Sequence, residues 1–512
     1  MAHPALHARV SPVWVRWLPW VLLSACAVLW AARWPLFPLS LDPSYHLAIT
    51  QQIVDARGPI VYEWGEYAPV GRPHLYPPVL HLLLAGLLTL TSSPIGTLRL
   101  ATAVIVPLIL LTIYLTARRL LSAPRALACV LMALASFTWW LQLGMTLAAG
   151  VGLIELLWLM VALKAQRRVA AACLLALLAY THLGLSCVAV VTLLAGAGLR
   201  AIDARCALAT LGWGGLMALP WLAHIGRHAG TFRVVPRYEN TTIEIVPLLL
   251  LLACVGAWHS WKARGRDGWL LSLWLGFCAY AANFSFRWLS GEGMLPIILL
   301  AGYAAARLSS QVATRFRHRC SRWTVMGLIA GAVVASPSWS VSPSGVRLRW
   351  LEAVPFHLVN GSPPMATDRF MPVPAMERLG ELVERVSHPT EILWSNASYA
   401  GGLVAALAHR PTSSAMFYEV PPARPFDPIG AAHWILWFKI GPQPGTPTLE
   451  ELRRRDALEL VAYDELAMVF RNPAAGEPAR PPEAVVPLWA AFVLLCAVCG
   501  AILWDFRERT HG

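Results

Sequence analysis

The sequence alternates between long apolar runs and short polar segments that carry most of the arginines. A helix needs about 20 residues to cross roughly 30 Å of hydrocarbon, so an apolar run of that order indicates a membrane helix. Such runs lie near residues 14–34, 98–117, 126–142, 147–163, 169–182, 183–199, 206–224, 244–261, 268–284, 293–307, 323–337 and 485–504. The pattern predicts a polytopic α-helical membrane protein with about 12 to 13 membrane helices.

Basic residues indicate which loops face the cytoplasm, because short cytoplasmic loops carry an excess of Lys and Arg. Basic clusters occur within 118–125, 164–168, 200–205, 262–266 and 307–322. All of these basic clusters face the cytoplasm only if the apolar stretch 79–90 does not cross the membrane. We therefore expect an interfacial or re-entrant helix at 79–90. A crossing at 79–90 is the alternative. We expect a multi-pass protein of the plasma (inner) membrane with both termini in the cytoplasm and the first run retained, since no small-residue cleavage site follows it.

The composition agrees with this class of protein. Of the 512 residues, 57% are hydrophobic and only 13% are charged, which is too apolar for a soluble chain. The net charge of +13 lies largely in short loops between apolar runs, so membrane topology explains it and we expect no nucleic-acid partner. All ten cysteines lie outside residues 341–483, and that segment therefore has no disulfide framework.

Residues 341–483 differ from the rest of the chain in their prolines, charges and short apolar runs, and they predict an extracytoplasmic α/β domain. Helical periodicity is present at 374–386, and a glycine-containing turn leads into a second helix that ends at Pro411. Strands are expected at 391–394, 433–439 and 466–471. The chain then divides into a transmembrane domain (1–340), this α/β domain, and a final membrane helix with a cytoplasmic tail (484–512).

The polar segment 35–78 follows the first span and carries the first candidate site. It places Asp42 and His46 one helical turn apart, which membrane residence does not require. Ionisable residues at membrane depth are costly, so Glu155, Arg287 and Glu292 near span ends are further candidates. On the expected topology these groups share the outer face, where two carboxylates suit Mg²⁺ or Mn²⁺ and an arginine suits a phosphate. These are the parts for handling a phosphorylated lipid.

Four segments carry a resemblance to one family. Residues 42–78 start with Asp-Pro and continue with Trp64, a Pro-Val-Gly-Arg turn that ends at Arg72, and a Tyr-Pro at Tyr76. This run resembles the first external loop of the oligosaccharyltransferase catalytic subunit, a GT-C glycosyltransferase. AGVGLIE, ending at Glu155, is similar to its second external loop. TTIE, ending at Glu244, and FRWLSGEG at 286–293 resemble two later motifs.

The resemblance implies a GT-C-like fold and an inverting transfer of a sugar from a polyprenyl-(pyro)phosphate carrier to an extracytoplasmic glycan, lipid or protein. It implies that Arg287 holds the lipid phosphate and that Asp42 acts as general base or metal ligand, with Glu155 and His46 as further catalytic candidates. The other expected substrate-binding residues are Glu244, Arg72, His74, Tyr76 and Glu292. Leu153 stands where the family has an aspartate, and the Trp-Trp-Asp motif is missing. These departures argue against glycosylation of Asn-x-Ser/Thr sequons, and a metal-independent transfer stays open beside a Mg²⁺ or Mn²⁺ site at Asp42 and Glu155.

Each candidate residue also has a purely structural interpretation. Asp42 before Pro43 is a good helix N-cap, Arg287 could anchor the chain to headgroups, and Glu244 could cap a helix. Two other functional classes stay open. One is a catalytically inactive scaffold or sensor of GT-C type. The other is a lipid or solute transporter, which predicts internal repeats and charges near the bilayer midplane.

Overall fold

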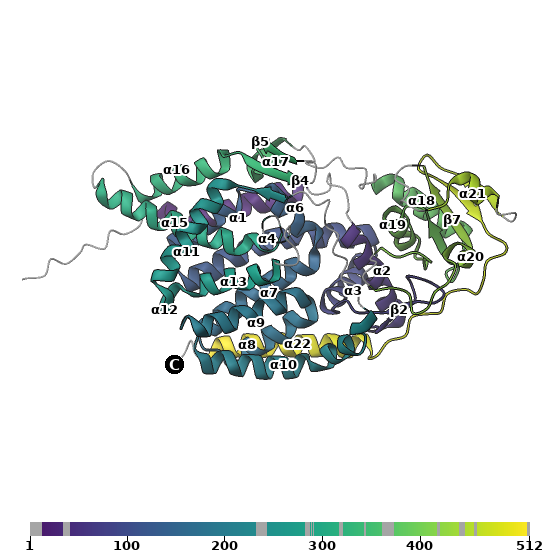
Figure 1. Cartoon of the computed structure of the whole chain (residues 1–512), viewed down its shortest axis with the longest axis horizontal. Helices are drawn as coiled ribbons and strands as arrows, with labels where there is room; N and C mark the ends of the chain where they lie inside the picture. Colours follow the sequence, from purple (N-terminus) through teal and green to yellow (C-terminus); the bar gives the residue numbers. More distant parts are fainter. Residues whose placement is uncertain are drawn as a thin grey trace, which may run out of the picture.

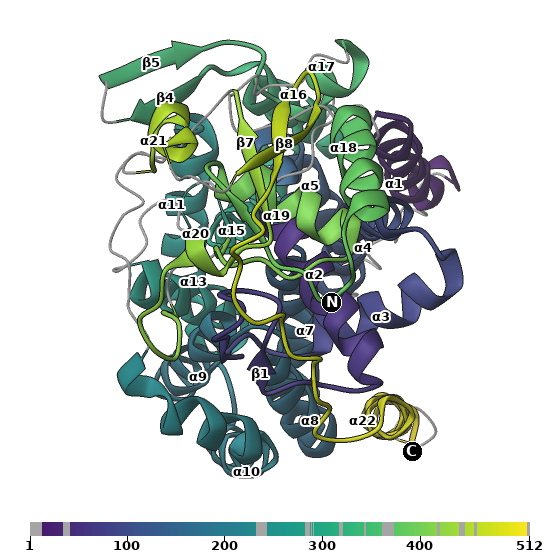
Figure 2. The ribbon, with the colours of Figure 1, turned by 90° about the vertical axis from the view of Figure 1, so that its right-hand side faces the viewer.

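The computed structural model describes residues 13–33, 41–231, 243–281, 287, 289, 291–316, 321–342, 345–360, 373–416, 420–439, 446–454 and 458–508. The apolar helices lie side by side in one bundle, and a smaller α/β unit sits at one end of it (Figure 1). In the end-on view of Figure 2, the α/β unit lies in front of the bundle. The start of the first external loop, at residues 35–40, lies outside the described residues.

Every predicted apolar run is helical over most of its length. The bundle helices are α1 (Val13–Arg33), α4 (Pro94–Leu120), α5 (Ala123–Ala133), α6 (Phe137–Met145), α7 (Leu147–Lys164), α8 (Arg168–Thr181), α9 (Leu183–Gly198), α10 (Ala204–Arg227), α11 (Pro247–Lys262), α13 (Trp269–Ala281), α15 (Met294–Arg315), α16 (Arg322–Ala335) and α22 (Leu488–Glu508). Five helices of the described chain, α4, α7, α10, α15 and α22, are long and apolar enough to cross a membrane alone, or six if the bent pair α5–α6 forms one span. These helices make the chain a multi-pass helical membrane protein. The total of about 12 to 13 membrane helices stays a prediction.

The run at 126–142 differs from its prediction as a single span. It folds as α5 and α6, which meet at an angle of 85°. Ser136 caps the second helix by accepting a hydrogen bond from Trp139 N at 3.2 Å, and Phe137 N donates to the Glu352 carbonyl at 3.1 Å. A capping serine and a distant backbone acceptor together favour a break that apolar periodicity alone does not reveal.

The segment after α1 is more regular than its polar composition predicted. It forms α2 (Leu41–Ala56), then the hairpin of β1 (Tyr62–Glu63) and β2 (Arg72–Pro73), and then α3 (Val79–Thr91). The helix expected at 79–90 is therefore present. Its 13 residues span about 20 Å at 1.5 Å per residue, less than the hydrocarbon thickness, and whether it crosses stays a prediction.

The α/β unit contains a four-stranded sheet in the order β6-β7-β9-β8. Its strands are β6 (Leu393–Ser395), β7 (Trp434–Phe438), β8 (Glu459–Tyr463) and β9 (Ala467–Arg471). Only the β6–β7 pair is parallel. Three of the strands were predicted; β8 was missed because its residues are mostly exposed. The two predicted helices, α18 (Val373–Val386) and α19 (Ser398–Ala408), pack on this sheet through a shared apolar core.

Smaller elements complete the fold. They are η2 (Ala229–Thr231), α12 (Arg264–Asp267), α17 (Val354–Asn360), α20 (Pro428–Ala431) and α21 (Leu449–Arg453). A second sheet was not predicted. It joins β3 (Ile243–Ile245) to the hairpin of β4 (Ser338–Ser342) and β5 (Gly345–Arg349) in the order β3-β4-β5. The division of domains at residue 341 stays a prediction.

Candidate active site

Tyr76, in the loop between α2 and α3, lies where three distant segments meet. Burial raises the pKa of Tyr76, the negative charges of Asp42 and Glu292 raise it further, and the positive charge of Arg287 lowers it. Asp42 comes from the first turn of α2, and Arg287 and Glu292 precede α15. Four of the predicted residues therefore lie close enough for their charges to act on one another, while their roles stay predictions.

Arg287 and Glu292 form the ion pair of this site. Arg287 Nη1 lies 2.7 Å from Glu292 Oε1 and donates to the Tyr280 hydroxyl at 3.0 Å. The Glu292 carboxylate is buried, yet its second oxygen accepts no hydrogen bond from the described residues. The Arg287 side chain keeps 22% of its surface exposed. A partly exposed guanidinium is the kind of group that binds a phosphate bidentately.

The aromatic side chains behind Tyr76 form a buried cluster around His46. His46 Nδ1 lies 2.9 Å from His81 Nε2, and its ring centroid lies 5.0 Å from that of Tyr76. Burial lowers the pKa of His46 to about 3, and nearby His182 and His74 lower it further. His46 is therefore neutral at pH 7, and it can orient Tyr76 without supplying a positive charge.

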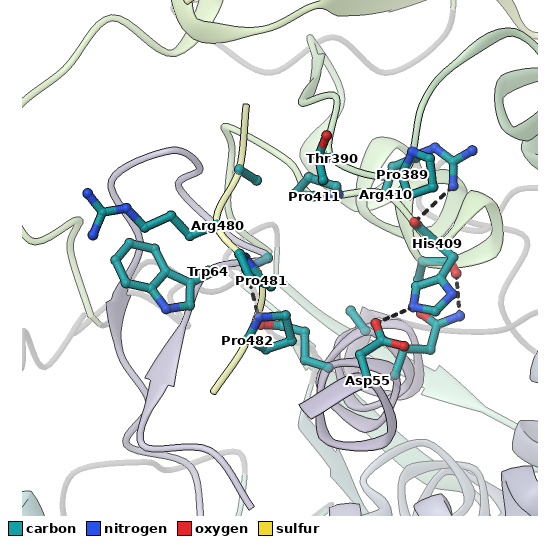
Figure 3. Close-up of a pocket in the computed structure, with 16 residues that line it drawn as sticks. Asp55, Trp64, Pro389, Thr390, His409, Arg410, Pro411, Arg480, Pro481 and Pro482 are labelled. Carbon is teal, nitrogen blue, oxygen red and sulfur yellow. Dashed lines mark hydrogen bonds and ion pairs between the residues drawn. The ribbon is translucent and has the colours of Figure 1, made fainter. Parts of the chain in front are cut away.

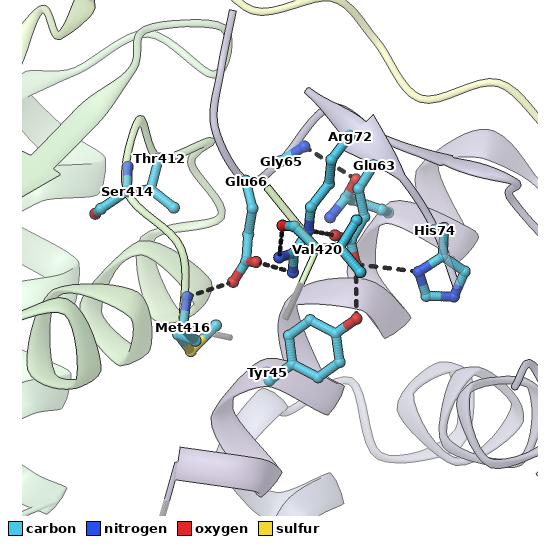
Figure 4. Close-up of polar contacts among 11 residues, drawn as sticks. Tyr45, Glu63, Gly65, Glu66, Arg72, His74, Thr412, Ser414, Met416 and Val420 are labelled. Atoms are coloured by element: carbon cyan, nitrogen blue, oxygen red, sulfur yellow. Dashed lines mark hydrogen bonds and ion pairs between the residues drawn. The ribbon is translucent and has the colours of Figure 1, made fainter. Parts of the chain in front are cut away.

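Arg72 lies in a second, fully buried ionic group (Figure 4). Its guanidinium pairs with both Glu63 and Glu66 and donates to the Val420 carbonyl at 3.0 Å. Glu66 in turn accepts from Met416 N at 2.9 Å. Burial lowers the pKa of Arg72, but the two carboxylates outweigh it and hold the pKa above its usual range. This group ties the first external loop to the segment after α19.

Two more features fix this loop. His74 Nδ1 lies 3.0 Å from Glu63 Oε1, so His74 belongs to the buried ionic group. Gly71 has a φ of +68°, and a Cβ there would lie 2.6 Å from the Glu63 carbonyl oxygen, so the turn requires glycine. The substrate-binding roles expected for Arg72 and His74 stay predictions, because their polar contacts here are structural.

Glu155 lies on α7, facing the junction of α8 and α9. It is buried and accepts from Thr181 Oγ1 at 2.8 Å, while its other oxygen has no hydrogen-bond partner among the described residues. One turn earlier, a Cβ at Gly152 would lie 3.3 Å from His182 Cβ. The charges of Glu292 and Arg287 act on His182. His182 therefore lies between Glu155 and the Arg287 pair.

Sequence reasoning missed His182 and Tyr280. The available signal for His182 was its place as the one basic side chain in the apolar stretch 169–199. Its Nδ1 accepts from Leu185 N at 3.1 Å and so caps α9. Tyr280 lies in the last turn of α13, and a Cβ at Gly184 would lie 2.6 Å from its ring. Small Gly184 thus lets the ring approach α9 and reach Arg287.

The predicted metal set of Asp42 and Glu155 stays a prediction. Among the described residues, no group of three or more His, Cys, Asp or Glu side chains is arranged to hold a metal ion. The Glu155 carboxylate accepts a hydrogen bond from Thr181 on α8, and the Asp42 charge acts on Tyr76. Carboxylate oxygens are hard ligands that suit Mg²⁺ or Mn²⁺.

Glu244 has a different environment. It lies on β3, is buried, and accepts from Ser136 Oγ at 3.4 Å. Burial raises its pKa to about 6, hydrogen bonds from Thr138 and Ser338 lower it, and the charge of Glu352 raises it. These contacts hold β3 against the start of α6, and the role in substrate binding stays a prediction.

A cavity of about 240 Å³ lies between the far end of α2 and the α/β unit (Figure 3). Its lining includes Asp55, Trp64, His409 and Arg480, and it includes none of the predicted site residues. Asp42 and Asp55 stand at opposite ends of α2, about 20 Å apart along the helix axis. This cavity is therefore separate from the group around Tyr76.

No family model and no curated protein matches this chain. Solved structures do share its fold, and they define a class, the membrane glycosyltransferases of GT-C type. The resemblance predicted from the first external loop is confirmed at the level of the fold.

Three of these structures show the extent of the match. ArnT from Cupriavidus metallidurans, bound to undecaprenyl phosphate, is 16% identical, with a TM-score of 0.58 over 90% of this chain and 99% of that one. The Archaeoglobus fulgidus oligosaccharyltransferase in complex with Zn and sulfate is 13% identical, with a TM-score of 0.54 over 81% and 68%. Arabinofuranosyltransferase AftD from Mycobacteria is 14% identical, with a TM-score of 0.55 over 91% of this chain and 42% of AftD. At these identities the similarity establishes the fold alone.

Proposed function

We propose that this protein is an inverting glycosyltransferase that moves a sugar from a polyprenyl-phosphate or polyprenyl-pyrophosphate carrier to an extracytoplasmic acceptor. One observation carries the proposal: Arg287 is oriented by Glu292 at 2.7 Å and by the Tyr280 hydroxyl at 3.0 Å, and the same charges act together with that of Asp42 on Tyr76. The fold supports it, since structures that share this fold were solved with undecaprenyl phosphate and with dolichol-phosphate.

Arg287 binds the lipid phosphate in this proposal. Its guanidinium already has one nitrogen held by Glu292 and Tyr280, which orients the planar group before a ligand arrives. The arginine side chain keeps 22% of its surface exposed, and in the proposal its positive charge neutralises the charge that develops on the departing phosphate. Glu292 keeps the arginine in place, and its second oxygen, which accepts no hydrogen bond from the described residues, can accept one from the sugar.

Asp42 acts as the general base. It takes the proton from an acceptor hydroxyl, whose oxygen attacks the anomeric carbon from the face opposite the phosphate. The new carbon–oxygen bond forms as the bond to the phosphate oxygen breaks, and the phosphate leaves with the electron pair, which inverts the anomeric centre. Tyr76 stays protonated because its pKa is raised, so its hydroxyl can donate to the same phosphate or acceptor. Each step uses positioned side chains and none depends on a metal ion.

The test uses the purified protein in lipid nanodiscs with a panel of undecaprenyl-phosphate-linked sugars. We expect Asp42→Asn to lower transfer by about 10²–10⁴-fold, the usual contribution of a general base, while native mass spectrometry still detects bound undecaprenyl phosphate. Asp55→Asn, at the far end of the same helix, is the matched control and should transfer normally. Unchanged transfer in Asp42→Asn would remove the mechanism. Binding of the lipid by the wild type without transfer of any sugar in the panel would favour the scaffold class instead.

A further inference from the structure

The β3-β4-β5 sheet has its polar face inside and its apolar face outside. Side chains directly opposite each other in antiparallel strands share a face, and the register pairs Glu244 with Ser340 and Ser338 with Arg349. Glu244, Ser338 and Ser340 are buried, toward the start of α6 where Ser136 contacts Glu244. In a water-soluble sheet the alternation runs the other way, with the apolar face packed on the core.

The outward face of this sheet is apolar on all three strands. The register places Ile245 beside Trp339 and Ile243 beside Val341, and continues with Leu348 and Val346 on β5. Trp339 is 47% exposed, Val346 65% and Leu348 53%. Trp350, which follows β5 on the same alternation, is exposed as well. A contiguous apolar surface of this kind on a folded protein indicates a contact with lipid or with a partner.

The position of the sheet argues for lipid. Only two residues separate α16 from β4, so the hairpin begins directly at the end of an apolar helix. Nearby, Arg33 in the last turn of α1 donates to the carbonyls of Leu358 and Val359 on α17, at 3.0 and 2.9 Å. Figures 1 and 2 both place β4, β5 and α17 on the rim of the bundle rather than between its helices.

The types of side chain on this sheet fit the boundary between the lipid headgroups and the acyl chains. Tryptophan is enriched where headgroups meet acyl chains, and Trp339 and Trp350 flank the apolar face. Arg347 and Arg349 alternate with its apolar residues and point the other way, so no charged side chain of β5 interrupts the apolar face. Arg349 also lies 3.7 Å from Glu352, which fixes its side toward the protein.

We propose that the face formed by Trp339, Val341, Val346 and Leu348 lies in the headgroup boundary of the bilayer and contacts phospholipid. The sheet is a shallow lateral anchor that holds β3, and with it the start of α6, at the membrane surface. This inference concerns a surface separate from the group around Tyr76, and it holds whether or not the proposed transfer occurs.

The experiment places the photoreactive residue p-benzoylphenylalanine at Val346 or, as the matched control, at the neighbouring Arg347, whose side chain points to the opposite face. The full-length protein is irradiated in nanodiscs of phosphatidylethanolamine and phosphatidylglycerol that also contain undecaprenyl phosphate. Intact-mass spectrometry then identifies each adduct. We expect a phospholipid adduct at position 346 and a several-fold smaller one at position 347.

Three results would overturn the proposal. They are equal phospholipid adducts at both positions, an adduct at 346 whose mass is that of undecaprenyl phosphate, and a folded protein with no lipid adduct at 346. The same substitution at Leu348 provides a second position on the apolar face, so failure of one variant to fold leaves the test intact. Folding of each variant is checked by its thermal midpoint in the nanodisc.

Discussion

Two arginines of this protein face glutamates next to the same loop, and they differ in how completely they are neutralised. Arg72 is buried between Glu63 and Glu66 and also donates to a backbone carbonyl. Arg287 pairs with Glu292, keeps part of its surface exposed, and faces a glutamate whose second oxygen accepts no hydrogen bond from the described residues. The Arg72 side chain is only 3% exposed, which leaves a ligand no access to it, whereas the Arg287 side chain is 22% exposed.

The difference has an energetic basis. Removing charges from water costs several kcal/mol per ion, so a buried ionic group persists only if nearly all of its hydrogen bonds are made. The Arg72 group meets this condition through Tyr45, which donates to Glu63 at 2.8 Å, and through Met416 N. A site that must bind and release a phosphate cannot be satisfied in this way beforehand. For this reason the proposed function places the lipid phosphate at Arg287 rather than at Arg72.

The largest expected effect on stability comes from Arg72. Arg72→Met leaves two buried carboxylates without their cation, and we expect a loss of about 3–5 kcal/mol in the free energy of unfolding, as for other broken buried pairs. Steric-trap unfolding in nanodiscs measures it. The matched control is Arg480→Met, which removes an exposed arginine whose guanidinium lies 5.2 Å from the centroid of the Trp64 ring, at a cost of about 1 kcal/mol or less. Equal losses in the free energy of unfolding of both variants would show that Arg72 does not stabilise the first external loop through its buried ion pairs.

Substitution of Arg287 should affect transfer activity more than stability, the reverse of what we expect for Arg72. Arg287→Ala should lower transfer from an undecaprenyl-phosphate-linked sugar by about 10²–10³-fold, the effect of losing one charge-stabilising donor. Because the single change leaves Glu292 buried without its partner, Arg287→Ala with Glu292→Gln is compared as well. Arg287→Lys keeps the charge but loses the planar fork, and should fall in between. Full activity in Arg287→Ala would assign the phosphate to another group.

The sequence predicted the membrane helices well because a long apolar run has few alternatives to a helix in lipid. It predicted a shared outer-face site for Asp42, Glu155 and Arg287, through topology and the resemblance of the first loop, and that site stays a prediction. It could not separate the roles of the two arginines. The carbonyl that fixes Arg72 belongs to Val420, 348 residues away in the chain, and no local pattern reveals such a partner.

The same limit explains the elements that were missed. The strand pairing of Ile243–Ile245 with Ser338–Ser342 joins segments almost a hundred residues apart. The apolar residues of this sheet face outward, so the rule that apolar alternation marks the core gives the wrong face. His182 caps α9 inside an apolar stretch, where a lone histidine carries no spacing signal. Each of these features is set by tertiary contacts rather than by local preference.

Glu66 provides a smaller test, through pH. Burial raises the pKa of Glu66 to about 7. The positive charge of Arg72 lowers this pKa, but Glu63 pairs with the same arginine and its negative charge raises the pKa of Glu66 again. A carboxyl with a raised pKa in the folded state binds its proton more tightly there, so its contribution to stability is complete below about pH 4.5 and is lost as the pH rises through 7. We expect the free energy of unfolding to fall by about 1–3 kcal/mol between pH 5 and 8.

The matched variant is Glu66→Gln, which keeps an acceptor for Met416 N but has no proton to lose. Its stability should be nearly flat over the same pH window. Glu63 does not disturb this window: burial opposes ionisation, but Arg72 and His74 hold its pKa down to about 2, so its contribution is lost only as the pH falls below about 4.5. An identical pH slope in wild type and Glu66→Gln would mean that Glu66 remains ionised throughout.

The smallest expected effect on stability belongs to the ion pair of Asp55 and His409 (Figure 3). Like the contact between Glu66 and Met416, this pair joins the first external segment to the α/β unit, but it lies at the surface. His409 Nε2 lies 2.7 Å from Asp55 Oδ2, and the side chains are 50% and 42% exposed. Because water screens this pair, Asp55→Asn should change the free energy of unfolding by about 0–1 kcal/mol. A double-mutant cycle with His409→Asn isolates the pair, since asparagine tolerates the φ of +55° at position 409. A coupling as large as the loss in Arg72→Met would show that exposure does not explain the difference between the Asp55–His409 pair and the buried Arg72 group.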